Sequence, residues 1–298
     1  MRSDIEIISH GVHLSAWHYA AETDDLTTPR GRPCVVMAHG IGGTKDSGLE
    51  PYAERFAEVG ADVVLFDYRG FGLSDGQQRQ FLDHRRHRED YHAVVAHARA
   101  LPGVDPDRIV LWGTSYSGGH VIAVAAEDHL IAGVMSQGAA MDGLACVLGI
   151  WSYAGPRQVL RVTLHSALDL LTALLNRRPH FIKLAGEPES AAAMSSDDTL
   201  PGYSAIWGPS FVNQMAGRGL VPLLFNRPVT RAKRLRMPVH LIILNHDVIT
   251  PPPAMEKVAK RVRGPVRVER MDVGHFDIYV GDPFEQVVKA ETEFLRSL

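Results

Sequence analysis

The sequence of 298 residues has only two cysteines, Cys34 and Cys146, so it carries no framework of disulfide bonds. Long hydrophobic runs are missing as well. No apolar stretch approaches the roughly twenty residues that a membrane-spanning helix needs, and the first residues lack the apolar core of a signal peptide. These absences favour a cytoplasmic protein without a membrane span.

An excess of charge of one sign is also absent. The formal net charge is -3, which gives no reason to expect nucleic acid as a partner. Histidine and cysteine pairs at the spacing of metal ligands are missing, so neither a metal nor a cofactor is expected. The hydrophobic content of 45% and charged content of 22% are ordinary for a soluble globular protein. The composition leaves the oligomeric state open, a homo-oligomer included.

Short apolar strands alternate with helical stretches in the first half of the chain, after an opening hairpin. Strands are expected at 34–38, 62–67, 109–112 and 131–136, and helices at 49–59, at 84–101 and just after 115. This order predicts an α/β fold, with a mostly parallel sheet that has helices on both faces.

The alternation stops at about residue 141 and resumes near residue 232. Between them, residues 158–175 have helical spacing, with four leucines on one stripe: Leu164, Leu168, Leu171 and Leu175. We expect residues 142–231 to form a helical lid inserted into one core domain, which comprises residues 1–141 and 232–298. The second part of the core is expected to add strands at 239–245 and 266–271 and helices at 253–263 and 283–298.

One serine stands where a predicted strand turns directly into a helix, in the stretch Gly113-Thr114-Ser115-Tyr116-Ser117-Gly118-Gly119. Such a turn, called a nucleophile elbow, strains the backbone of its central residue and exposes that side chain. It needs small neighbours because strand and helix nearly touch. Ser115 is therefore the predicted nucleophile.

A serine nucleophile needs a base, and the base needs an acid that orients it. In open α/β sheets, catalytic groups gather at the carboxyl ends of the strands. His275 follows the last predicted strand and Asp247 follows the strand before it, which gives the chain order Ser, Asp, His. Asp142, which comes after the strand that follows the elbow, is an alternative acid, although a turn residue is the interpretation that we favour for it.

Together these features resemble the α/β-hydrolase family over about residues 30–140 and 236–298. The shared features are the predicted strand followed by His39-Gly40, the turn at 67–74, the elbow, the late aspartate and the terminal Gly274-His275. The elbow is similar to that of the dienelactone hydrolases and serine peptidase-like esterases, and to polyketide-offloading acyltransferases and thioesterases. It departs from the pattern G-x-S-x-G at Ser117, where a glycine is usual.

The resemblance implies an oxyanion hole made by the backbone N–H groups of Tyr116 and Ile41, or of Gly42 if the loop turns one residue later. It implies a serine hydrolase of the carboxylesterase or thioesterase kind, acting on a small acyl ester or thioester with an apolar portion. Two alternatives remain: an acyltransferase with the same triad, and a non-catalytic binding protein on a hydrolase scaffold. Met215 and five lid aromatics could line an acyl pocket, although packing within the lid is the interpretation that we favour for most of them; the aromatics are Trp151, Tyr153, Tyr203, Trp207 and Phe211.

Overall fold

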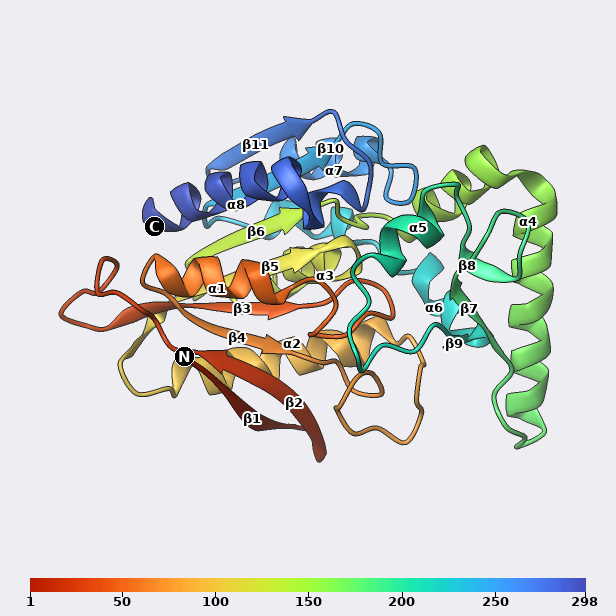
Figure 1. Cartoon of the computed structure of the whole chain (residues 1–298), viewed down its shortest axis with the longest axis horizontal. Helices are drawn as coiled ribbons and strands as arrows, with labels where there is room; N and C mark the ends of the chain where they lie inside the picture. The colour runs from red at the N-terminus through yellow and green to blue at the C-terminus, as the bar shows by residue number, and fades with distance from the viewer.

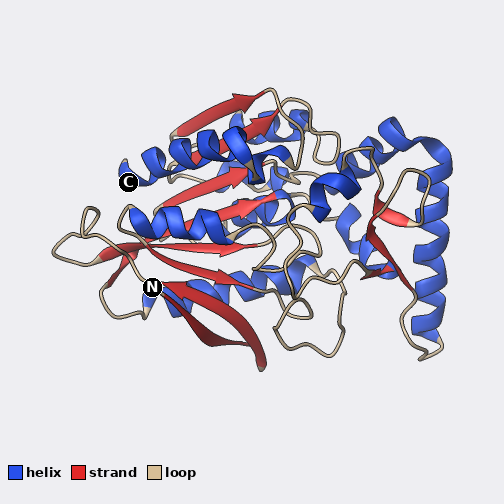
Figure 2. Ribbon diagram, in the orientation of Figure 1, coloured by secondary structure: helices blue, strands red, loops and turns tan.

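An eight-stranded sheet forms the centre of the molecule in the computed structural model, which describes all residues from 1 to 298 (Figures 1 and 2). The sheet has the order β1-β2-β4-β3-β5-β6-β10-β11. Its strands are β1 (Arg2–Ser9), β2 (Val12–Tyr19), β3 (Arg32–Ala38), β4 (Asp62–Phe66), β5 (Val104–Thr114), β6 (Gly133–Gln137), β10 (Val239–Leu244) and β11 (Val266–Met271). Only β1 and β2 run antiparallel to their neighbours, so the predicted α/β fold with a mostly parallel sheet is confirmed.

The inner strands are apolar on both faces because helices cover both faces. Every residue of β4, β6 and β10 is buried, which explains why these strands read as continuous apolar runs in the sequence. Figure 1 shows α1 and α8 on one face and α2, α3 and α7 on the other. These helices are α1 (Glu50–Glu58), α2 (His84–Arg99), α3 (Ser115–Ala125), α7 (Pro252–Ala259) and α8 (Gly281–Arg296).

Residues 142–231 lie across the edge at which the parallel strands end (Figure 1). The segment contains α4 (Gly143–Leu174), α5 (Thr199–Ser204) and α6 (Leu220–Leu224), and a three-stranded sheet of β7 (Phe181–Ala185), β8 (Ala192–Met194) and β9 (Met215–Ala216). The prediction of a purely helical insertion missed this small sheet, because its strands are two to five residues long and too short for a periodic pattern.

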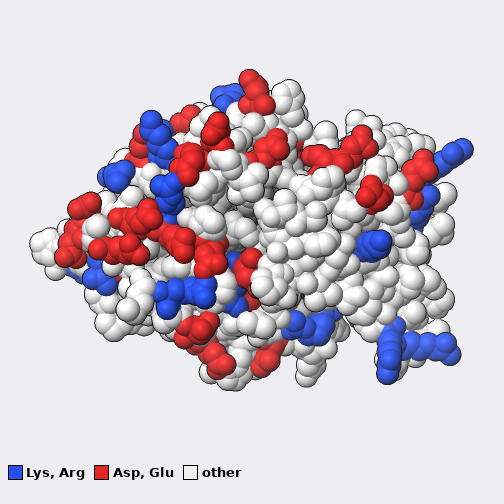
Figure 3. Space-filling view, viewed as in Figure 1, with Lys and Arg blue, Asp and Glu red and all other residues white.

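The helix α4 is bent at Gly155, whose φ of 75° is outside the helical range, and Pro156 follows it directly. A proline in a helix removes one backbone hydrogen bond and clashes with the preceding turn, so the bend has a local cause. The leucine stripe predicted on this helix faces solvent: Leu164 is 60% exposed and Leu171 is 51% exposed. On the face in Figure 3, charged side chains gather over the sheet and are sparse over the lid. No helix combines the length and the apolar character needed to cross a membrane.

Candidate active site

The turn at Ser115 has no connecting residue, because β5 ends at Thr114 and α3 begins at Ser115. Ser115 has a φ of 55°, in the left-handed region that residues other than glycine seldom adopt. Strand and helix touch here: a Cβ on Gly113 would lie 2.4 Å from the carbonyl oxygen of Ser117. A Cβ on Gly118 would lie 2.6 Å from the Cβ of Ala139. Glycine is therefore required by space at both positions.

Ser117, at the position where glycine is usual, fits because its side chain has partners. Its Oγ donates a hydrogen bond to the carbonyl oxygen of Ala38 at the end of β3, at 2.7 Å. The same Oγ accepts the backbone N–H of Thr114 at 2.9 Å, which closes a capping box at the start of α3. Ser117 thus ties the elbow to the neighbouring strand, a role that the sequence pattern does not reveal.

Three of the predicted residues form a hydrogen-bonded row. The Nε2 of His275 lies 3.1 Å from the Oγ of Ser115, and its Nδ1 lies 2.6 Å from Oδ2 of Asp247. Asp247 follows β10 and His275 follows β11, so two neighbouring strands deliver the acid and the base to the same edge of the sheet. All three side chains are at least 95% buried. Such a row can accept a proton from the serine and hold the imidazole in one tautomer.

The carboxylate of Asp247 is fixed by the turn that follows it. Its Oδ1 accepts the backbone N–H groups of Ile249 and Thr250, each at 2.8 Å, and the hydroxyl of Thr250 lies 2.6 Å from Oδ2. Asp142, the alternative acid, has other hydrogen-bond partners. It caps the start of α4 through the N–H of Leu144 and pairs with Arg227, so the structure brings Asp247 and not Asp142 to His275.

The residues of both predicted oxyanion donors line the same cavity as Ser115. The backbone N–H of Tyr116 is in the first turn of α3, where a helix offers it no internal partner. Ile41 is three residues beyond β3, and its carbonyl oxygen accepts a hydrogen bond from Tyr203 of the lid at 3.0 Å. Gly40 is in close contact with the elbow: a Cβ there would lie 3.3 Å from the Cβ of Ser115. The choice between the amides of Ile41 and Gly42 stays a prediction.

A neutral cluster of aromatic and imidazole rings packs against the side chain of Tyr116 and hydrogen-bonds its hydroxyl group. The hydroxyl of Tyr116 lies 3.0 Å from Nδ1 of His87, and the hydroxyl of Tyr68 lies 3.0 Å from Nδ1 of His120. Burial lowers the pKa of His87 and of His120 well below the usual range and raises the pKa of Tyr116. The rings are therefore uncharged at neutral pH and hold the tyrosine without adding charge beside the elbow.

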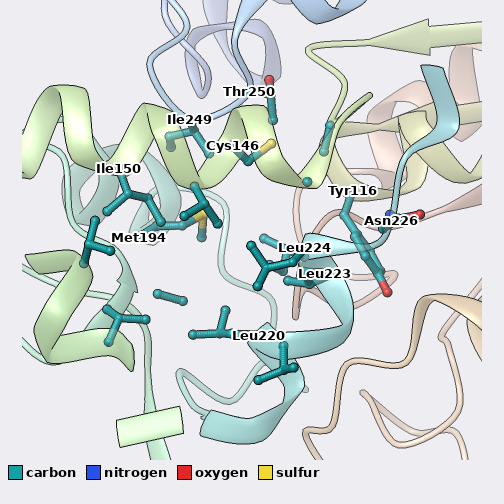
Figure 4. A pocket seen from close by; sticks show the side chains of 18 of the residues that line it. Tyr116, Cys146, Ile150, Met194, Leu220, Leu223, Leu224, Asn226, Ile249 and Thr250 are labelled. Atoms are coloured by element: carbon teal, nitrogen blue, oxygen red, sulfur yellow. The ribbon is translucent and has the colours of Figure 1, made fainter. Parts of the chain in front are cut away.

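An apolar cavity of about 210 Å³ opens between Ser115 and the lid (Figure 4). Of its 22 lining residues 16 are hydrophobic, and most come from α4, α6 and the loops beside the elbow. Of the lid aromatics considered from sequence, only Tyr153 lines it; Trp207 and Phe211 stack on each other and Trp151 is exposed. The thiol of Cys146 also faces this cavity, and burial raises its pKa to about 12, which keeps it protonated.

A second, smaller cavity of about 20 Å³ also has Ser115 in its wall and is lined by Gly40, His275 and Tyr279 among others. That volume is enough for about one water molecule. The serine therefore stands between a large apolar space and a small space beside its imidazole. The structure has no group of three or more His, Cys, Asp or Glu residues that could hold a metal ion.

With this fold and elbow, the chain belongs to the α/β-hydrolase fold family, whose model matches residues 33–282. It is similar to the quorum-quenching protein AidA of Acinetobacter baumannii, with 34% identity over 99% of this chain and 94% of that protein. The thiohydrolase AneE of Aspergillus aculeatus is 27% identical over 99% of this chain and 93% of its own length. The crystal structure of the α/β hydrolase GrgF from a Penicillium species superposes with a TM-score of 0.82, at 22% identity, covering 100% of this chain and 98% of that one.

Proposed function

We propose that this α/β hydrolase is a serine hydrolase that cleaves a carboxylic ester or thioester through an acyl-enzyme. The observation that carries the proposal is the hydrogen-bonded row of Ser115, His275 and Asp247, in which Ser115 lines the apolar cavity. The relative AneE is named a thiohydrolase, which supports a thioester as one kind of substrate.

In the proposed reaction the Oγ of Ser115 attacks the acyl carbonyl carbon while Nε2 of His275 takes the hydroxyl proton. The negative charge that develops on the carbonyl oxygen is stabilised by the N–H groups of Ile41 and Tyr116; removal of one such donor typically costs about 3 kcal/mol. His275 then returns the proton to the departing alcohol or thiol, and Asp247 stabilises the imidazolium. Water deacylates the serine by the same steps.

The two cavities suggest how the substrate lies. An acyl chain is apolar and fits the large cavity, whereas the small cavity beside His275 has room for the hydrolytic water. An acyl transfer to an alcohol would use the same residues, with the acceptor in place of water. Product analysis with added alcohol separates hydrolysis from transfer.

The test is Ser115→Ala, assayed with p-nitrophenyl esters of several chain lengths. We expect kcat/KM to fall by at least about a thousandfold, because without the nucleophile only binding and oxyanion stabilisation remain. Ser204→Ala, at an exposed serine of α5, is the matched control and keeps wild-type activity. A fluorophosphonate should label the wild-type protein at Ser115. Undiminished hydrolysis by Ser115→Ala refutes the nucleophile, and absence of both labelling and hydrolysis favours a binding protein.

A further inference from the structure

The loop of residues 40–43, which carries the predicted oxyanion donor, has few bonds of its own to fix its backbone. Three of its four residues are glycine, and Gly42 has a φ of 61°. The N–H of Ile41 has no hydrogen-bond partner in the protein, and the bond within the loop, from the N–H of Gly43 to the carbonyl oxygen of Gly40, is long at 3.3 Å. Such a loop needs contacts from outside to hold one conformation.

One of these contacts comes from Tyr203 in the lid. Its hydroxyl donates to the carbonyl oxygen of Ile41 at 3.0 Å, and this is the only hydrogen bond that the backbone of Ile41 makes. Tyr203 is 6% exposed, and burial raises its pKa, so the hydroxyl keeps its proton and stays a donor. Because a trans peptide is planar, with its oxygen and hydrogen on opposite sides, a fixed carbonyl of Ile41 also fixes the direction of the N–H of Gly42.

The same tyrosine contacts the loop that carries the base. Its ring stacks on the ring of Phe276, directly after His275, with the centroids 5.4 Å apart and the planes at 26°. Glycines make room on both sides: a Cβ on Gly202 would lie 2.6 Å from the Cβ of Phe276, and a Cβ on Gly43 would lie 3.1 Å from the hydroxyl oxygen of Tyr203. One side chain of the lid therefore joins the loop at 40–43 to the loop of His275.

We propose that Tyr203 is a positioning residue that holds the peptide between Ile41 and Gly42 in the direction that oxyanion binding requires. If this peptide turned over, the carbonyl oxygen of Ile41 would replace the N–H of Gly42, and its partial negative charge would face the charge that develops on the substrate. The hydrogen bond from Tyr203 opposes this rotation. It matters whether Ile41 or Gly42 supplies the donor, because both N–H groups adjoin the same peptide. This inference rests on the proposed function.

The experiment is Tyr203→Phe, which keeps the ring and removes only the hydroxyl. With p-nitrophenyl octanoate we expect kcat to fall by about tenfold and KM to stay within about twofold, because oxyanion contacts strengthen in the transition state and not in the bound ester. A kcat within about twofold of the wild type overturns the proposal, whatever happens to KM.

A trifluoromethyl ketone, 1,1,1-trifluoro-2-decanone, gives a second readout. The Oγ of Ser115 adds to its carbonyl carbon, the hydroxyl proton passes to His275, and an oxyanion remains on the adduct. The inhibition constant of this ketone should rise in Tyr203→Phe by the same factor by which kcat falls. An unchanged inhibition constant refutes a role in oxyanion binding.

Tyr91→Phe is the matched control, because it removes another buried hydroxyl that donates to a backbone carbonyl, that of Trp112, at 2.8 Å. Both variants should lower Tm by about 2–4 °C, since each loses one hydrogen bond. Only Tyr203→Phe should lose activity. An equal loss of kcat in the two variants would assign the effect to general destabilisation and refute the positioning role.

Rescue separates the hydrogen bond from the packing of the ring. Replacement of Tyr203 by 4-aminophenylalanine restores a donor, so kcat should return to within about threefold of the wild type. If Tyr203→Phe does not fold, 4-fluorophenylalanine, which fills the place of the hydroxyl without donating, replaces it in the comparison. A wild type that hydrolyses no ester and is not labelled at Ser115 by a fluorophosphonate refutes the proposed function itself, and the inference falls with it.

Discussion

At the scale of single residues, two aspartates that follow strands have contrasting surroundings. Asp247 is 5% exposed and accepts hydrogen bonds from two backbone N–H groups and from the imidazole of His275. Asp142 caps α4 and faces the half-exposed guanidinium of Arg227, with Nη2 and Oδ2 2.8 Å apart. The same residue type thus binds the imidazole of His275 in one loop and caps a helix in the other.

We predict that Asp247→Asn lowers kcat by about 10⁴-fold, because an amide in this position favours the wrong imidazole tautomer. Asp142→Asn should keep the rate within twofold, since asparagine also caps helices and the exposed pair with Arg227 contributes little. Steady-state kinetics on one ester decide between them. A large loss in Asp142→Asn with an active Asp247→Asn would reverse the assignment.

Sequence reasoning could reach Ser115, Asp247 and His275 because each follows a strand, and parallel strands end at one edge of a sheet. The hydrogen bonds of Ser117 depend instead on how the start of α3 packs against the end of β3. Residues of this kind become visible only in three dimensions.

At the scale of one element, α4 exposes leucines and buries polar side chains, the reverse of what is usual in a surface helix. Its leucines face solvent, while Asp169 is fully buried and Ser166 nearly so. The carboxylate of Asp169 accepts the N–H of His180 just before β7, at 2.7 Å, and the N–H of Arg218 at 2.9 Å. Asp169 therefore joins the helix to the rest of the lid, together with Gln158, whose amide donates to the carbonyls of Ser190 and Ala192. Periodicity predicted the part of α4 after its bend, but it missed the part from Gly143 and could not show which face is covered.

We predict that Asp169→Ala destabilises the protein by about 3 kcal/mol, because it leaves two backbone N–H groups without partners. Leu171→Ser should change the free energy of unfolding by less than about 0.5 kcal/mol, since its side chain is half exposed. Urea unfolding measures both variants, and hydrogen exchange at β7 should quicken only in the first. A greater loss in Leu171→Ser would show that the leucines are covered in solution.

At the scale of the whole molecule, one buried acid links α8 to the centre of the sheet. Glu291 is fully buried, and its Oε2 accepts a hydrogen bond from the indole N–H of Trp112 in β5 at 2.9 Å. Its other oxygen has no partner. Burial raises the pKa of Glu291 to about 8, so the folded protein holds this side chain protonated at neutral pH.

A raised pKa in the folded state makes stability depend on pH with a definite sign. The unfolded chain releases this proton near pH 4.5, so the contribution of Glu291 is complete below that pH and is lost as pH rises through about 8. Buried histidines act in the opposite sense: burial lowers the pKa of His84 and of His240 to about 4, and their contribution is lost as pH falls below 6.5. Above that pH they no longer change stability.

We predict that the free energy of unfolding falls between about pH 7 and pH 8.5, and that Glu291→Gln removes most of this fall. Glutamine stays neutral and can still accept the N–H of Trp112. Urea unfolding at the two pH values, with and without the substitution, measures the effect. An identical slope in the variant would assign the pH dependence to other groups.

Both chain ends lie on the side of the sheet opposite the lid (Figure 1). The parallel strands start there and finish under the lid, so their direction separates the termini from Ser115 by the length of the sheet. Immobilisation on a solid support, or fusion to a carrier protein, at either terminus would therefore leave the cavity accessible to substrate. Both termini could be used at once for the same reason.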